Sequence, residues 1–165
     1  MSLHKLTVVL FFVFPMVLCK AQTAPARPIE PTAIGVVYHL DPTSQELKKL
    51  PDEQWKEQGG FNGYRTYIKV SGKSSSFRVK ADEKGEFVFN TGSPEKVSLY
   101  RFTEGGKRQF EFKKLTMGGT EFIKGLPVEV SKYGESSYKL VPASPLTPGE
   151  YAIVIAGEVY TFGVD

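Results

Sequence analysis

Apolar and polar residues alternate with a period of two through most of the chain after Ala33. Such alternation is typical of a β-strand with one buried and one solvated face. Ten short segments show the pattern or an apolar core of strand length, at residues 34–40, 64–70, 77–80, 87–89, 97–102, 108–115, 128–130, 138–141, 151–155 and 159–162. Their number and spacing predict an all-β protein built as an antiparallel β-sandwich, with a small β-barrel as the alternative.

Glycine marks the breaks between these segments. Glu104-Gly105-Gly106-Lys107 predicts a hairpin turn that pairs residues 97–102 with residues 108–115. Lys84-Gly85, Gly118-Gly119 and Tyr133-Gly134 predict similar turns. Helical patterning is almost missing, and only residues 45–58 could hold one or two helical turns.

Residues 1–21 have the pattern of an export signal. A basic start at His4 and Lys5 precedes 13 largely apolar residues, and Cys19 and Ala21 place small side chains before a cut. An apolar run of this length is shorter than the roughly 20 residues that cross a bilayer. We therefore expect a secreted or periplasmic protein. A cut after Ala26 and lipidation at Cys19 are the alternatives, although Leu18 stands where lipoprotein signals carry a small residue.

The rest of the chain predicts a proline-rich linker at residues 22–32 and a single domain at residues 33–165. Loss of Lys5 and Lys20 with the signal lowers the net charge from +3 to +1. A chain so close to neutral is not expected to bind nucleic acid, and after cleavage no membrane span is expected.

The domain lacks the raw material for most familiar catalysis. Cleavage removes the one cysteine, and His39 is the one histidine that remains. The carboxylates that lie near one another in the sequence are Asp52, Glu53 and Glu57, and then Asp82 and Glu83. Their spacing in polar turns does not predict two groups that face each other across a cleft. We therefore expect no enzymatic activity, no metal and no cofactor.

The most specific local motif is Leu146-Thr147-Pro148-Gly149-Glu150-Tyr151. It resembles the tyrosine corner of immunoglobulin-like and fibronectin type III-like sandwiches. The resemblance implies that Leu146, Pro148 and Gly149 carry the chain from one sheet to the other, and that the Tyr151 hydroxyl bonds back to the chain a few residues upstream. The role implied for this motif is structural.

The wider layout resembles small exported bacterial proteins of unknown function. The matching residues are Ile34-Gly35-Val36, Leu99-Tyr100-Arg101, Pro148 to Tyr151, and Phe162 to Asp165. This resemblance implies a location in the bacterial cell envelope and brings no activity with it.

Four residues are candidates for ligand binding: Trp55, Tyr67, Arg101 and Arg108. Trp55 and Tyr67 could share an exposed platform that stacks on a sugar ring, but covering a sheet edge and cross-strand packing are the structural alternatives. Arg101 and Arg108 lie on the basic, exposed side predicted for the hairpin, where they could meet anionic polymers or a solvated surface. The other side of that hairpin is expected in the core and carries Tyr100, Phe102, Phe110 and Phe112.

Two functions remain open. The first is a non-catalytic module that binds an envelope polysaccharide or a partner protein. The alternative is a structural or assembly component whose open sheet edges pair with other subunits. Lys69, Lys80 and Lys132 within or beside strands indicate protected edges, which favours a monomer.

Overall fold

The computed structural model describes residues 28–60, 63–81, 85–103 and 107–165. Thirteen strands in these residues form three sheets, none of which closes into a barrel, and one short 3-10 helix, η1 (Pro94–Lys96), interrupts them. The predicted all-β sandwich is therefore confirmed. The expected export signal, the linker before residue 28 and the turns at residues 84 and 104–106 lie outside the described ranges.

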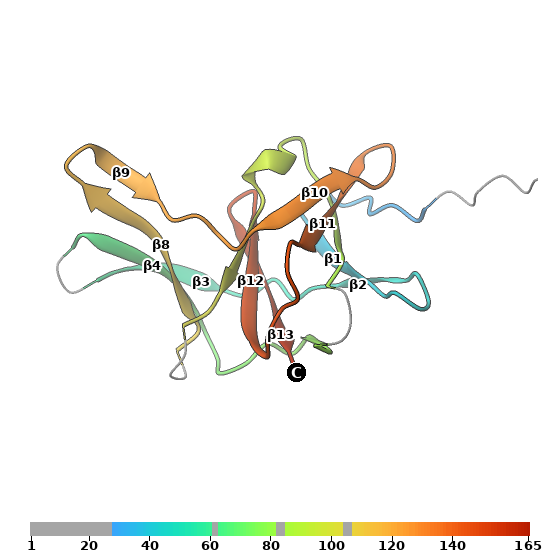
Figure 1. Ribbon diagram of the computed structural model, residues 1–165, viewed down its shortest axis with the longest axis horizontal. Coiled ribbons are helices and arrows are strands. Elements are labelled where there is room, and N and C mark those ends of the chain that lie inside the picture. Colours follow the sequence, from blue (N-terminus) through green and yellow to red (C-terminus); the bar gives the residue numbers. More distant parts are fainter. Residues whose placement is uncertain (1–27, 61–62, 82–84, 104–106) are drawn as a thin grey trace, which may run out of the picture.

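Two sheets make the sandwich (Figure 1). Sheet A contains, in spatial order, β10 (Val128–Lys132), β11 (Ser137–Pro142), β6 (Phe87–Asn90), β1 (Val37–Leu40) and β2 (Leu47–Lys49). Sheet B contains β5 (Arg78–Val79), β13 (Glu158–Val164), β12 (Gly149–Ile155) and β7 (Ser98–Arg101). Their neighbouring strands are antiparallel apart from the parallel pair β5 and β13.

This strand order is that of an immunoglobulin-like fold. Strands β1, β6, β11 and β10 occupy the places of strands A, B, E and D, and β7, β12 and β13 occupy those of C, F and G. The tyrosine corner also lies where that fold requires it, because Tyr151 is in β12, the strand F equivalent. The sequence predicted the sandwich, and the structure supplies its strand order.

The main core fills the space between sheets A and B. From β12, the side chains of Tyr151, Ile153 and Ile155 point into it, and each is at most 1% exposed. They meet Phe87 and Phe89 from β6 across the sandwich. The alternation of β12 leaves Ala152 and Val154 on its other face, which is also covered. Sheet B is therefore apolar on both sides.

Sheet C covers that second face of sheet B. It contains, in spatial order, β3 (Trp55–Gly59), β4 (Arg65–Val70), β8 (Gln109–Thr116) and β9 (Gly119–Phe122). Its strands come from two insertions into the sandwich, one between β2 and β5 and one between β7 and β10. Ile68 and Phe110 pack on Tyr100 and Phe102 of the β7 region. In Figure 1 sheet C extends away from sheet B on the side opposite sheet A.

Two expectations were wrong. Residues 45–58 contain strands β2 and β3 and no helix, because their backbone groups extend sheets A and C beside β1 and β4. The hairpin expected from residues 97–102 and 108–115 does not form, since β7 pairs with β12 whereas β8 pairs with β4 and β9. Their aromatic residues do meet in the core, but face to face between sheets: the Tyr100 and Phe110 rings stack 4.3 Å apart.

Two residues that the sequence assigned to the linker contact the domain in the structure. Glu30, assigned to the linker from the sequence, binds the turn between β10 and β11: its carboxylate accepts hydrogen bonds from the Ser136 amide at 2.9 Å and the Ser137 hydroxyl at 2.7 Å. Pro31 is buried. These polar contacts could not be read from proline content alone. In the described part of the chain, no helix is long and apolar enough to cross a bilayer.

Candidate functional site

The outer face of sheet C presents rows of polar side chains that run across its strands. Strand register places Lys56, Lys69 and Gln109 in one row, and Gln58, Tyr67 and Glu111 in the next. A third row joins Arg65 to Lys114 and Glu121. The opposite face of β4 holds the buried Ile68 and Val70, so alternation directs these rows to solvent. We call this surface the polar face.

Tyr67 is the one aromatic residue of the polar face in the described strands, and its surroundings fix its ring. A Cβ added at Gly60 would lie 3.3 Å from the ring, so a glycine there leaves room for the tyrosine. The pKa of the Arg65 guanidinium is raised, first by its hydrogen bond to Tyr67 and next by the charge of Glu111. The half-buried ring therefore stands between side chains that donate and accept hydrogen bonds.

Cations exceed carboxylates on the polar face. Arg65 donates to Glu111 at 3.0 Å, and Lys114 lies 3.2 Å from Glu121. Lys56 and Lys69 stand directly opposite each other on β3 and β4, and within the described residues neither forms an ion pair. The two lysines leave an excess of positive charge beside Tyr67.

Trp55 does not share this platform with Tyr67. Trp55 is opposite Val70, on the inner face, while Tyr67 is opposite Gln58, on the outer face. The Trp55 side chain is partly buried against the core between sheets B and C. The two residues therefore do not form the common platform considered from the sequence, and Trp55 covers the edge of the core, which is the structural alternative.

Arg108 is buried and not exposed as expected. Its side chain is 2% exposed and donates to both oxygens of Glu53 and to the Ser71 carbonyl oxygen, the last at 3.0 Å. Its guanidinium carbon also lies 5.2 Å from the centre of the Phe102 ring. A side chain enclosed in this way holds neighbouring parts of the fold together. It is not accessible to an anionic polymer, which was the role considered from the sequence.

Arg101 is exposed at the tyrosine corner, away from the polar face. Its Nη2 donates to the Pro148 carbonyl oxygen at 3.1 Å, and its guanidinium lies 6.0 Å from the Tyr151 ring centre. The Tyr151 hydroxyl donates to the Thr147 carbonyl oxygen at 2.7 Å, the bond that the sequence motif predicted. Leu146 packs against the main core. Arg101 thus supports the corner.

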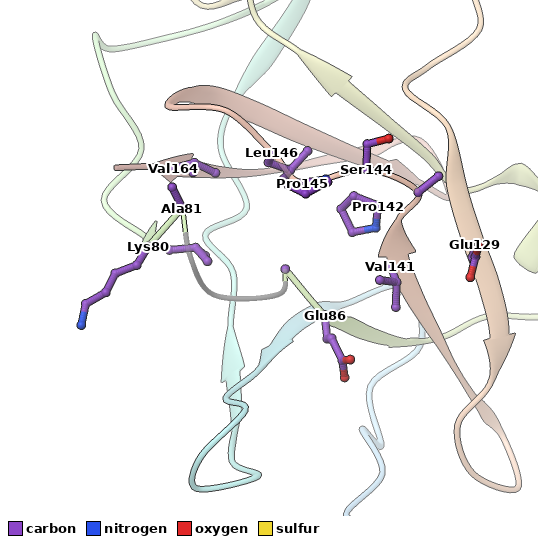
Figure 2. Close-up of a pocket in the computed structure, with 13 residues that line it drawn as sticks. Lys80, Ala81, Glu86, Glu129, Val141, Pro142, Ser144, Pro145, Leu146 and Val164 are labelled. Carbon is purple, nitrogen blue, oxygen red and sulfur yellow. The ribbon is translucent and has the colours of Figure 1, made fainter.

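A pocket of about 510 Å³ opens between sheets A and B beside the corner (Figure 2). Its walls are mostly apolar and include Val79, Val141, Leu146 and Val164. Figure 2 shows the charged ends of Lys80 and Glu86 pointing away from the space that these walls enclose. Glu86 instead accepts a hydrogen bond from Lys139 at 3.0 Å. The pocket therefore offers apolar contact without convergent polar groups.

Large apolar side chains gather at the free end of sheet C. Tyr64, Leu115 and Phe122 are 62%, 55% and 63% exposed, and Met117 at the β8–β9 turn is fully exposed. Nearby charges on this end are paired, as between Lys113 and Glu57 at 2.9 Å. Several large apolar side chains exposed at one end of a sheet are typical of contact with another molecule.

Sequence reasoning identified Tyr67 but missed the residues around it. Lys56 and Gln58 belong to β3, a strand that the sequence did not predict, and only strand pairing places them beside Tyr67. Gln109 and Glu111 belong to β8, which was expected to pair elsewhere. The chain matches no family model, no curated protein and no solved structure, so the polar face is assessed on its own geometry.

Proposed function

We propose that the protein is an exported, non-catalytic binding module whose polar face holds a glycan of the bacterial cell envelope. The observation that carries this proposal is the single tyrosine ring in a solvated sheet face, flanked by Gln58 and Arg65. An aromatic ring packs against the apolar face of a sugar, and its polar neighbours bond to hydroxyl groups. A wide sheet face also suits a polymer better than a small molecule, because it offers no enclosure.

The chemistry of the face supports binding without catalysis. Glu111 is its central carboxylate and is tied to Arg65 at 3.0 Å. Hydrolysis of a glycosidic bond needs two carboxyl groups placed on opposite sides of that bond. The second carboxylate of the face, Glu121, lies on the adjacent strand β9, opposite Lys114 and not Glu111, and is paired with Lys114. Neither group faces the other across a cleft.

The test is retention of the purified protein, recovered from the exported fraction of an expressing host, on insoluble peptidoglycan, chitin and cellulose. A Tyr67→Ala variant should lose retention, because the stacking surface is gone. Tyr64→Ala is the matched control, since Tyr64 is exposed next to β4 and should be replaceable without loss. Retention of Tyr67→Ala equal to that of the unchanged protein, or no retention of any form, would refute the proposal.

A structural or assembly role is the second candidate, favoured by the edge strand β9. All four of its residues are exposed. The Ile123 amide donates to the Phe112 carbonyl oxygen at 2.8 Å, so antiparallel alternation turns the backbone groups of Thr120 and Phe122 away from β8. Such an edge can accept another strand. Concentration-dependent association in sedimentation, abolished by Thr120→Pro, would support this role over glycan binding.

A further inference from the structure

We propose that the glycan is acidic, and that Lys56 and Lys69 are the residues that select its negative charge. This inference rests on the proposed function, because it names the chemical class of the ligand at the same face. The shared chemistry is a polymer that carries carboxylate or phosphate groups along a sugar chain.

The first argument is the cost of the lysine pair to the fold. Lys56 and Lys69 are cross-strand partners, and like charges directly opposite each other destabilise a sheet. Arg65 and Lys114 are also opposite each other, but each has a carboxylate within 3.2 Å that offsets the repulsion. Among the described residues no carboxylate forms an ion pair with either lysine. An external anion would supply the missing charge.

Protection of a sheet edge does not explain the pair. Lysine on an edge strand discourages pairing with other chains, and Lys56 lies on β3, an edge of sheet C. Lys69, however, lies on β4, between β3 and β8. A lysine on an interior strand protects no edge, and a neutral residue there would remove the repulsion.

The position of the pair fits the rest of the face. Lys69 and Tyr67 are two residues apart on β4, or about 7 Å along the strand. Gln109 is opposite Lys69 on β8. An anionic group on the lysines would therefore leave a neighbouring sugar ring over Tyr67, within reach of Gln58 and Gln109. One acidic polymer could make both contacts at once.

The test compares soluble polymers by affinity electrophoresis. Polygalacturonate supplies carboxylates on a sugar chain, a phosphomannan supplies phosphates on one, and dextran is neutral. The unchanged protein should bind an acidic polymer at least tenfold more tightly than dextran, and salt should weaken this binding because exposed charges are screened. The Lys56→Gln/Lys69→Gln variant should lose that preference. A preference for only one of the two acidic polymers identifies which anion is selected.

A second pair of exposed lysines controls for net charge. Lys49→Gln/Lys96→Gln removes the same charge outside sheet C and should bind like the unchanged protein. Equal loss in both double variants would show general attraction and overturn the inference. Equal affinity for dextran and the acidic polymers would also overturn it, yet leave the proposed function standing if Tyr67→Ala still abolished binding. If Tyr67→Ala instead bound as tightly as the unchanged protein, the proposed function itself would be overturned.

Discussion

Arg108 and Glu53 form a two-bonded ion pair that joins the two insertions of sheet C. Arg108 Nη2 donates to Glu53 Oε1 at 3.2 Å, and Nη1 donates to the other carboxylate oxygen. Thr161 of β13 donates to the same carboxylate at 2.6 Å. Arg108 directly precedes β8, and Glu53 lies two residues before β3. The pair therefore fixes sheet C, and the polar face with it, on sheet B.

Removing one partner of this pair should destabilise the protein strongly. Arg108→Met leaves a carboxylate without its counter-ion in a largely enclosed place, and breaking a buried pair in this way costs about 3 kcal/mol or more. Urea unfolding of Arg108→Met and of Arg108→Met/Glu53→Leu measures the effect. The double variant should recover part of the loss. A cost below about 1 kcal/mol for Arg108→Met would show that the pair does not hold the sheets together.

The tyrosine corner should contribute a measurable hydrogen bond. Tyr151 is 1% exposed and bonds to Thr147, so Tyr151→Phe leaves the buried packing intact and removes the bond. We expect a loss of about 1 kcal/mol in the free energy of unfolding. Tyr64→Phe, at an exposed ring, is the control and should change little. Equal values for the two variants would mean that the corner bond adds no stability.

Gly125 should tolerate no side chain, because the backbone of β7 crosses it. A Cβ at Gly125 would lie 2.4 Å from the Leu99 carbonyl oxygen, which also accepts a hydrogen bond from the Leu126 amide at 2.6 Å. Gly125→Ala should therefore lower stability by about 1 to 3 kcal/mol, the usual range for overpacking. Gly92→Ala is the control, since open space surrounds Gly92. Matching thermal midpoints would contradict the close approach.

The attachment of Glu30 should depend on pH in the acid range. Hydrogen bonds from Ser137, Ser136 and Glu135 lower the pKa of Glu30 from 4.5 to about 2. Because the folded pKa lies below the unfolded one, the attachment is complete above pH 4.5 and weakens as the pH falls towards 2. The amide resonance of Ser136 should follow this titration in NMR spectra. In Glu30→Gln the same resonance should show no such titration.

The ring of Tyr67 should depend on the glycine beside it. A methyl group at Gly60 would press on the ring from 3.3 Å, so Gly60→Ala should turn the ring and weaken glycan retention several-fold while leaving the core unchanged. Retention on peptidoglycan and the unfolding midpoint separate these effects. Gly59→Ala is the neighbouring control, because nothing lies within 4 Å of its added Cβ. Unchanged retention of Gly60→Ala would show that the ring position does not matter.

Ten segments with strand patterning were predictable because each supplies its own apolar side chains to a core. The corner was predictable for a related reason: Leu146 to Tyr151 is a local motif whose hydrogen bond spans four residues. Strands β2, β3 and β9 carry few buried side chains. These segments are strands because a neighbouring strand offers them backbone hydrogen-bond partners. Their own sequences do not show which strand that neighbour is.

The candidate site was likewise predictable only in part from the sequence. Tyr67 was identified from its own strand, where alternation with Ile68 fixes its side of the sheet. Its relation to Trp55, Lys56 and Gln58 depends on the register between β3 and β4, and the burial of Arg108 depends on a carboxylate 55 residues away in the chain. The sequence by itself determined which residues are apolar and where the ten patterned strands lie, since those properties are local. Tertiary structure alone decided which side chains share a face, because strand pairing joins residues that are distant in the chain.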